Sequence, residues 1–330
     1  MKTATKSGPR IVVIGGGTGS FTLLSALKNQ DAQITAIVNM VDSGGSTGVL
    51  RDEHGVLPPG DVRQCLVALA EAPEYLRDLF NYRFQEGGLD GHSFGNLFLT
   101  ALEKLNDNYA ETIEQASKIL KVKGTVLPVT VDDANLAMEL NGKTMVGEGS
   151  IDVADFDGAE RPRLYLDPAA EILPGASEAI WSADLVVIAP GSPHTSIVPV
   201  LLTDGMSEAL ASTQGKVVMV ANLVNKATQT NGYKLSDYLD LYEGVIGKGV
   251  IDAIIYNDNH IPKGLLEKYA EAGEKPVEVD LKELEKRDIE LIAAQLISKA
   301  PLEDDTVDST HGFIRHDERK TAKVSMRQIS

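Results

Sequence analysis

A cluster of glycines directly after a short apolar run is the feature that most restricts how this chain can fold. Residues 11–27 read IVVIGGGTGSFTLLSAL, a β-branched run, then four glycines in five positions, then a stretch typical of a helix. The glycines are Gly15, Gly16, Gly17 and Gly19. Glycine allows a tight turn and leaves peptide N–H groups open to a close neighbour, and the first turn of a helix attracts anions. The pattern predicts a strand, a phosphate- or sugar-binding turn that includes Thr18, and a helix; a tight turn that binds nothing is the alternative.

Similar apolar runs recur along the chain and alternate with helix-like segments. The runs are continuous and β-branched, which is typical of buried parallel strands, and they lie at 11–14, 34–38, 185–189, 217–222 and 252–256. The helix-like segments lie at 61–71, 94–105, 110–121, 175–182 and 262–272. This alternation predicts an α/β fold, a Rossmann-like, doubly wound and mainly parallel sheet.

The middle and the two ends of the chain differ from this pattern. Residues 125–166 hold short strand-like pieces broken by Asp-Asp and Asn-Gly, which predicts a small β-rich insertion with a tight hairpin turn. We expect this insertion to belong to a single domain spanning 11–300. Residues 1–10 are expected to form a disordered lead-in, and 301–330 a C-terminal tail that is either disordered or an added helix.

Composition excludes several classes of partner. The 330 residues carry a net charge of −17, which argues against nucleic acid or an anionic membrane surface. A single cysteine, Cys65, excludes an intramolecular disulfide and a cysteine-based zinc cluster. No apolar run has the length of a membrane span. We therefore expect a cytoplasmic protein that binds a small molecule.

A second glycine-rich stretch, VDSGGSTGVLRDEHGVLPPGD at 41–61, follows the second predicted strand. Its loop at 44–48 offers peptide N–H groups and hydroxyls to an anion, through Gly44, Gly45, Ser46 and Thr47. A carboxylate beside such loops repels phosphate unless a cation bridges them, so Asp42 is a candidate Mg²⁺ ligand and catalytic residue. Asp61 is expected to cap the helix that follows it.

The stretch GGLDGHSFGNL places His92, Ser93 and Asn96 at the start of a helix, with Ser93 as the expected cap. His92 is a candidate acid, base or substrate-binding residue because its charge changes near neutral pH. A histidine with ordinary structural hydrogen bonds is the alternative.

Polar residues also follow the later strands of the predicted sheet. The stretch APGSPHTSIVPVLL follows the strand at 185–189 and, like the first glycine turn, places peptide N–H groups and hydroxyls at the start of a helix. This predicts a second anion site, although ordinary helix capping explains part of the pattern. Its candidate residues are Gly191, Ser192, Thr195 and Ser196. Asn222 and Asn257 follow the next two strands and suit the edges of a base or ribose, and Tyr233 suits stacking on a ring.

Taken together, these blocks resemble the family that contains the gluconeogenesis factor YvcK and the 2-phospho-L-lactate transferase CofD. The resemblance covers about residues 11–317. It rests on the glycine turn, the PPGD and HSFGNL blocks, LPVTVDD, APGSPHTSIVPVLL, NGYKLSDYL, IPKGLLEKY and RHD at 315–317. The presence of PPGD, HSFGNL and RHD places it closer to the YvcK branch.

The resemblance implies a cytoplasmic Rossmann-like protein that binds a nucleotide-sugar of the UDP-N-acetylglucosamine type and requires no other cofactor. That branch is tied to cell shape and cell-wall precursor supply during gluconeogenic growth. The transferase branch instead implies a guanine-linked phospholactate donor, a deazaflavin acceptor and Mg²⁺. Ligand-facing positions carried over are Gly15–Gly19, Asp42, the 44–48 loop, Gly191–Ser196, Asn222, Asn257, Tyr269 and Arg315.

Departures from the family pattern favour binding over catalysis. Only Asp42 precedes the Gly-Gly pair, where two adjacent acids are expected, and Lys226 lies in a segment that differs from the family's run after Asn222. His194 stands where a larger aromatic is usual. A non-catalytic nucleotide-sugar-binding regulator is therefore preferred, with a Mg²⁺-dependent transferase as the alternative. A nicotinamide oxidoreductase is not favoured, because Ser20 stands where the dinucleotide-binding pattern has its third glycine and the acidic residue that binds the ribose is missing. A homodimer and a regulatory protein partner are left open.

Overall fold

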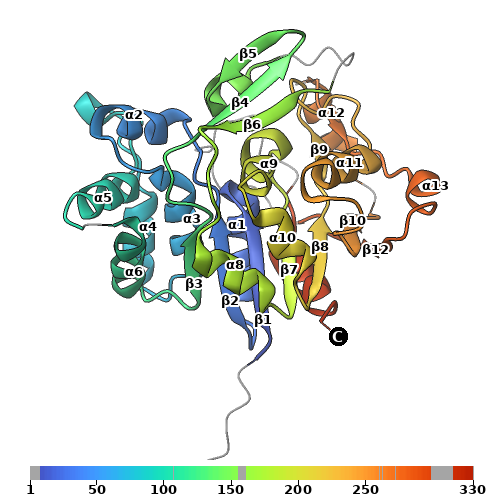
Figure 1. Ribbon diagram of the computed structural model, residues 1–330, viewed down its shortest axis with the longest axis horizontal. Helices are drawn as coiled ribbons and strands as arrows, with labels where there is room; N and C mark the ends of the chain where they lie inside the picture. The colour runs from blue at the N-terminus through green and yellow to red at the C-terminus, as the bar shows by residue number, and fades with distance from the viewer. Residues whose placement is uncertain are drawn as a thin grey trace, which may run out of the picture.

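A seven-stranded parallel sheet forms the centre of the computed structural model, which describes residues 8–106, 108–154, 161–259, 261, 263–271, 273–298 and 315–329. The strand order is β12-β10-β8-β7-β1-β2-β3, and every neighbouring pair runs parallel (Figure 1). The strands are β1 (Arg10–Gly15), β2 (Gln33–Val38), β3 (Thr125–Pro128), β7 (Leu185–Ile188), β8 (Lys216–Val220), β10 (Ala253–Asn257) and β12 (Glu290–Ala294). Ile11–Ile14 of β1 are almost fully buried, as their continuous apolar character predicts.

Helices cover both faces of this sheet. On one face α1 packs against α3 and α14; on the other, α8, α10, α11 and α9 pack against one another (Figure 1). The first group is α1 (Gly17–Leu27), α3 (Pro59–Leu69) and α14 (Glu318–Met326). The second group is α8 (Pro174–Trp181), α9 (Val198–Leu201), α10 (Met206–Ala211) and α11 (Leu235–Ile246). The buried thiol of Cys65 lies in α3.

The remaining elements extend the molecule on either side of this core. A helical group packs beside α3, at the left of Figure 1, and short elements surround β10 and β12 at the right. The helical group is α2 (Gly45–His54), α4 (Glu74–Asn81), α5 (Phe94–Glu103) and α6 (Tyr109–Leu120), with a 3₁₀ turn at Gly87–Leu89. The others are β9 (Val224–Asn225), α12 (Lys263–Glu271), β11 (Lys275–Pro276) and α13 (Leu281–Leu284), and a π-helical turn at Pro193–Ile197 precedes α9.

The strand order confirms the prediction of a Rossmann-like, doubly wound sheet. From β1 the chain adds β2 and β3 on one side, and then β7, β8, β10 and β12 on the other. The order therefore reverses between β1 and β7. In open α/β sheets, ligands bind beyond the carboxyl ends of the strands at such a reversal.

The β-rich insertion is a separate antiparallel sheet above the carboxyl ends of the central strands (Figure 1). It consists of β4 (Asn135–Leu140), β5 (Lys143–Val146), α7 (Glu148–Asp152) and β6 (Arg163–Asp167). Positive φ angles of 51° at Asn141 and 71° at Gly142 form the expected tight turn. The expected start near residue 125 is wrong, because β3 pairs with β2 in the main sheet.

The two ends also differ in part from the expectation. Arg10, expected to belong to the lead-in, begins β1, while residues 1–7 lie outside the described residues. Of the two options for the tail, a helix is correct for the last part, since α14 buries Ala322 and Ser325 and packs on α1. Residues 299–314 lie outside the described residues. Among the helices that the structure describes, none combines the length and apolarity needed to cross a lipid bilayer.

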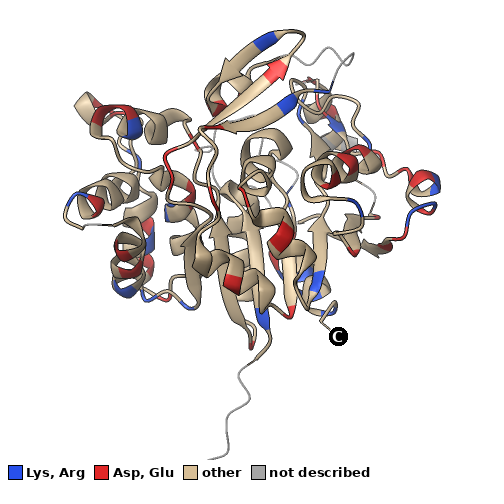
Figure 2. Ribbon diagram, in the orientation of Figure 1, with Lys and Arg blue, Asp and Glu red and all other residues tan. Residues whose placement is uncertain are grey.

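Acidic side chains account for the negative net charge without gathering at one place. In Figure 2, Asp and Glu are spread over helices at both sides of the molecule and are mixed with Lys and Arg. Exposed ion pairs such as Lys118 with Glu114 and Lys286 with Glu283 contribute to this mixture. The prediction that nucleic acid is not the partner stays a prediction.

Close packing by the chain itself explains two glycines of the first turn. A Cβ at Gly19 would collide with the carbonyl oxygen of Pro190, and a Cβ at Gly16 would collide with the carboxylate of Asp61. The start of α1 therefore packs directly against the turn after β7. The glycine cluster brings the two sides of the strand-order reversal together.

We predict that Gly19→Ala lowers the free energy of unfolding by about 1–3 kcal/mol, because the added methyl forces α1 away from Pro190. Gly244→Ala in α11 is the matched control, since a Cβ there meets nothing within 4 Å. A helical Gly→Ala change without a clash stabilises by up to about 1 kcal/mol. Urea unfolding of both variants measures this contrast, and equal effects would show that the contact with Pro190 does not restrict residue 19.

Candidate functional site

A cavity of about 420 Å³ opens at the strand-order reversal, beyond the carboxyl ends of β1, β7 and β8. The turn after β1 contributes Thr18 and Gly19, and the turn after β7 contributes Gly191 and Ser192. Residues from four further segments complete the lining: Asn222, Lys226, Tyr269, Glu274, Arg315 and His316. The predicted residues Thr18, Gly19, Gly191, Ser192, Asn222, Tyr269 and Arg315 thus meet at one place.

Asn222 fixes the shape of the cavity wall formed by the turn after β7. Its side-chain amide donates to the carbonyl oxygen of Gly191 at 2.7 Å, and its carbonyl oxygen accepts from the Gly191 N–H at 3.3 Å. One side chain therefore satisfies both backbone polar groups of Gly191. This pair of bonds holds Gly191 beside Gly19 at the reversal.

Charges of both signs line the cavity. Lys226 and Arg315 bring positive charge, and Glu274 is a buried acid. His316 contacts the carbonyl oxygen of Ala221 through Nε2 at 3.0 Å, and burial lowers its pKa to about 4. His316 is consequently neutral at neutral pH. Lys226 and Arg315 are the lysine and arginine of the lining, and Glu274 is its acid.

Asp61 binds the first glycine turn instead of capping its own helix. Its Oδ1 accepts from the Gly17 N–H at 2.8 Å, whereas Pro58 occupies the N-cap position of α3. The expectation that Asp61 caps α3 is therefore wrong: Asp61 lies in the first turn of α3 and reaches the start of α1. A carboxylate of the protein thus occupies an anion position at the start of α1. Burial, and next the charge of Asp42, raise the pKa of Asp61 to about 7.

Asp42 and Glu148 lie beside Asp61 and form an acidic group with it. Burial and a side-chain hydrogen bond to Asp42 raise the pKa of Glu148 well above its usual range. Asp42 Oδ1 also accepts from the Gly44 N–H at 2.7 Å. Within the described ranges, no three His, Cys, Asp or Glu side chains are arranged to hold a metal ion. The described residues therefore do not fit a metal cage, and Asp42 as a Mg²⁺ ligand stays a prediction.

The predicted anion loop at 44–48 is the first turn of a helix. Gly45, Ser46, Thr47 and Gly48 belong to α2, so the interpretation of this segment as a loop is wrong. Gly44 is the N-cap residue, and Thr47 is buried. None of these residues lines the cavity at the reversal.

Ser46, His92 and Asn96 meet at the start of α2. The hydroxyl of Ser46 lies 3.0 Å from His92 Nδ1 and accepts from the side-chain amide of Asn96 at 3.3 Å. Asn96 in turn accepts from Nε of the buried Arg63. Ser93 caps α5 by accepting from the Asn96 N–H, as expected. A Ser–His contact is a feature of some catalytic sites, and the role of His92 stays a prediction.

The remaining candidates lie around the cavity. Thr195 is buried, and Ser196 belongs to the π-helical turn. Tyr233 makes edge-to-face contacts with His194 and Tyr238 at ring-centroid distances of 5.9 and 5.7 Å. Asn257 lines a smaller adjoining cavity of about 150 Å³ that shares Asn222 with the first. Ligand binding at these positions stays a prediction.

Three residues near the cavity were not predicted. Asp152, at the end of α7, forms an ion pair with Lys226 at 2.6 Å. Glu274 and His316 line the cavity itself. Only His316 carries a sequence signal, because it lies in the RHD block; Asp152 and Glu274 lie in segments without any motif.

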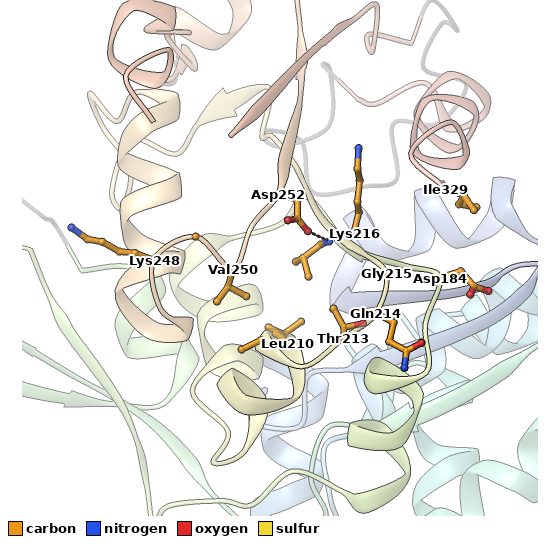
Figure 3. Close-up of a pocket in the computed structure, with 13 residues that line it drawn as sticks. Asp184, Leu210, Thr213, Gln214, Gly215, Lys216, Lys248, Val250, Asp252 and Ile329 are labelled. Atoms are coloured by element: carbon orange, nitrogen blue, oxygen red, sulfur yellow. Dashed lines mark hydrogen bonds between the residues drawn. The ribbon is translucent and has the colours of Figure 1, made fainter. Parts of the chain in front are cut away.

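A larger cavity, of about 700 Å³, lies at the opposite, amino edge of the sheet. Asp184, Lys216 and Asp252 lie at or just before the first residues of β7, β8 and β10 there. Figure 3 shows that Lys216 and Lys248 extend in different directions, and Asp252 accepts from the Val217 N–H at 2.7 Å. Because its cations do not converge, this cavity is a weaker candidate than the smaller one.

Comparison with known proteins shows the family. A family model described as 2-phospho-L-lactate transferase CofD matches residues 11–297. The chain belongs to the CofD/YvcK family. Members of this family include a Listeria monocytogenes protein named gluconeogenesis factor, 37% identical over 100% of this chain and 98% of its own. A Bacillus subtilis protein of the same name is 35% identical, over 96% of each chain.

A solved family structure has the same fold. A Bacillus halodurans protein superposes with a TM-score of 0.88 at 35% identity, and the match covers 97% of this chain and 99% of that one. A second structure of a Bacillus halodurans protein, described as a member of the UPF0052 family, gives a TM-score of 0.87. The Bacillus halodurans protein therefore has the fold of this chain over nearly its whole length.

We predict that Asp61→Asn changes how stability depends on pH. Unfolded Asp61 loses its proton near the ordinary pKa of 3.8, but folded Asp61 keeps it until about pH 7. The folded state thus binds more protons in that interval, so this carboxyl group's contribution to stability falls as pH rises from about 4 to 7.

The variant lacks this titration, so its stability relative to the wild type should rise by roughly 2–4 kcal/mol between pH 4 and pH 8. Urea unfolding of both proteins at several pH values measures the difference. A difference that stays constant over this interval would contradict the raised pKa.

Proposed function

We propose that this chain is a cytoplasmic regulatory protein that binds a nucleotide-sugar of the UDP-N-acetylglucosamine type. In this proposal the bound state links cell shape and cell-wall precursor supply to gluconeogenic growth, and catalysis is not required. The names of the Listeria and Bacillus relatives support a role in gluconeogenic metabolism. The cavity at the strand-order reversal supports the choice of ligand class.

The observation that carries the proposal is the meeting of two strand-end turns with two cations in one cavity. Gly19 and Gly191 come from opposite sides of the reversal, and Lys226 and Arg315 add positive charge. This arrangement suits a diphosphate, whose oxygens accept from peptide N–H groups and from cationic side chains. The volume of about 420 Å³ is within the range of small-ligand sites.

The adjoining smaller cavity supports a ligand with a base or sugar attached to the diphosphate. It holds about 150 Å³ and is lined by apolar side chains together with the amides of Asn222 and Asn257. Amides recognise the polar edges of bases and sugars, and apolar walls suit their faces. The two cavities adjoin at Asn222, so the proposal places the diphosphate in the larger one and the base or sugar toward the smaller one.

A Mg²⁺-dependent transferase of the 2-phospho-L-lactate type is the second candidate. The description of the matching family model favours it, and so does the Ser46–His92 contact. Among the described residues no three His, Cys, Asp or Glu side chains are grouped to hold a metal ion, so Asp42 would bind Mg²⁺ together with phosphates of the donor. Release of a nucleoside monophosphate that requires Mg²⁺ and is lost in Asp42→Asn would favour the transferase.

We predict that UDP-N-acetylglucosamine raises the melting temperature of the protein without added metal. Ligands that bind only the folded state stabilise it in proportion to the logarithm of their concentration over Kd. GDP, NAD and a deazaflavin are the comparison ligands in the same thermal-shift experiment. Stabilisation by NAD or the deazaflavin alone would contradict the proposal.

We predict that Arg315→Ala weakens binding of UDP-N-acetylglucosamine by roughly 1.5–3 kcal/mol, because a charge-assisted hydrogen bond to the ligand is lost. Arg319→Ala is the matched control: Arg319 is an exposed arginine of the same segment that does not line the cavity. Isothermal titration of both variants gives the two affinities. Equal affinities would show that Arg315 makes no contact with the ligand.

A further inference from the structure

Several polar groups from different loops converge on one carboxylate at the edge of the cavity. Lys226 Nζ lies 2.6 Å from Asp152 Oδ2, and the side-chain amide of Gln229 donates to Asp152 Oδ1 at 2.7 Å. The hydroxyl of Thr195 donates to the Ser192 hydroxyl at 2.8 Å and lies 3.5 Å from the same Oδ1. The side chains of Gln229 and Thr195 are about 99% buried, so these donors are fixed in place.

The donors belong to the strand-end loops, whereas the carboxylate belongs to the insertion. Thr195 follows β7, and Lys226 and Gln229 follow β8. Asp152 is the last residue of α7, which lies between β5 and β6. Lys226 also lines the cavity, together with Ser192, whose hydroxyl hydrogen-bonds to Gln229 at 3.1 Å. Lys226 thus belongs to the lining of the candidate site, Gln229 is hydrogen-bonded to a lining residue, and the acceptor Asp152 comes from the insertion.

The other end of α7 is attached to the opposite side of the reversal. The Glu148 N–H donates to the hydroxyl of Ser43 at 2.8 Å, and the Glu148 carboxyl group hydrogen-bonds to Asp42. The hydroxyl of Thr228 donates to the backbone carbonyl of Asp152 at 3.2 Å. This five-residue segment therefore connects the loop after β2 with the loops after β7 and β8.

We propose that Lys226 and Gln229 form a subsite for a phosphate group of the ligand, and that Asp152 occupies this subsite as an internal competitor. A phosphate oxygen accepts the same hydrogen bonds as a carboxylate oxygen, and a phosphate carries at least as much negative charge. Asp152 retains 38% side-chain exposure, so it can leave the donors without breaking the core. An anionic ligand that takes this position displaces Asp152 and releases one end of α7.

This inference rests in part on the proposed function, because both place an anionic ligand in the same cavity. It adds a regulatory element. Part of the binding free energy is needed to detach α7, so Asp152 lowers the apparent affinity of the protein for its anionic ligand. By linkage, a partner that holds α7 away from the cavity would tighten ligand binding by the same factor.

The test compares Asp152→Asn with Asp133→Asn by isothermal titration, using inorganic pyrophosphate and UDP-N-acetylglucosamine as probes. Both variants remove one negative charge, but Asp133 is an exposed residue that pairs with Arg51 and does not line the cavity. Asp152→Asn should tighten pyrophosphate binding by roughly five- to tenfold, a typical coupling between two competing states. Asp133→Asn should leave the affinity within about twofold of the wild type.

Two further measurements separate competition from a structural role of Asp152. Lys226→Met should weaken pyrophosphate binding, because it removes a donor from the subsite. Saturating pyrophosphate should speed hydrogen exchange of the 148–152 amides in the wild type. Circular dichroism and melting temperature confirm that each variant is folded, and Asp152→Ala serves as a second variant.

Unchanged or weaker pyrophosphate binding in both Asp152 variants, or no measurable binding in any variant, overturns the inference. In another outcome, UDP-N-acetylglucosamine binds the wild type while neither its affinity nor that of pyrophosphate changes in the Asp152 variants. That result would support the proposed function and contradict Asp152 as an internal competitor. If pyrophosphate binds but UDP-N-acetylglucosamine does not, and pyrophosphate binds more tightly to Asp152→Asn than to the wild type, the result supports Asp152 as an internal competitor and contradicts the proposed ligand.

Discussion

The candidate site depends on the pairing of β1 with strands on both of its sides. Hydrogen bonds to β2 and to β7 fix β1 in the middle of the sheet, so the turns after β1 and β7 end next to each other. Their separation is then limited by contact between Gly19 and the Pro190 carbonyl group. Any side chain at residue 19 would widen this junction. Both turns then border the same cavity.

Asp61 and Asp152 show that the protein supplies anions of its own at positions where a ligand was expected. Asp61 accepts from the start of α1, and Asp152 accepts from Lys226 and Gln229. Burial, and next the neighbouring Asp42, raise the pKa of Asp61 and of Glu148. The acids at the ends of the central strands therefore keep their protons to higher pH than free side chains do, which limits the negative charge gathered there.

The main elements were predictable because buried parallel strands are continuous and apolar, and helices between them have regular periodicity. The hairpin turn at Asn141–Gly142 was predictable for a local reason, since it needs positive φ at both residues. The hydrogen-bond partner of Asp61 was not predictable, because a carboxylate in the first turn of a helix gives no indication that it reaches residue 17. The roles of Asp152 and Glu274 depend on contacts across long stretches of sequence, which periodicity does not encode. The helical character of 45–48 was hidden by its two glycines and two hydroxyl residues.

The buried position of Cys65 has a practical consequence for spectroscopy. Its thiol is inaccessible in α3, and burial raises its pKa, so reagents that attack thiolates will spare it in the native protein. The chain contains no other cysteine. A cysteine introduced at Val153, whose side chain is exposed next to Asp152, would therefore accept a fluorophore or spin label at one place only. Because the native thiol does not react, a label at residue 153 would report movements of the insertion without removal of any natural residue.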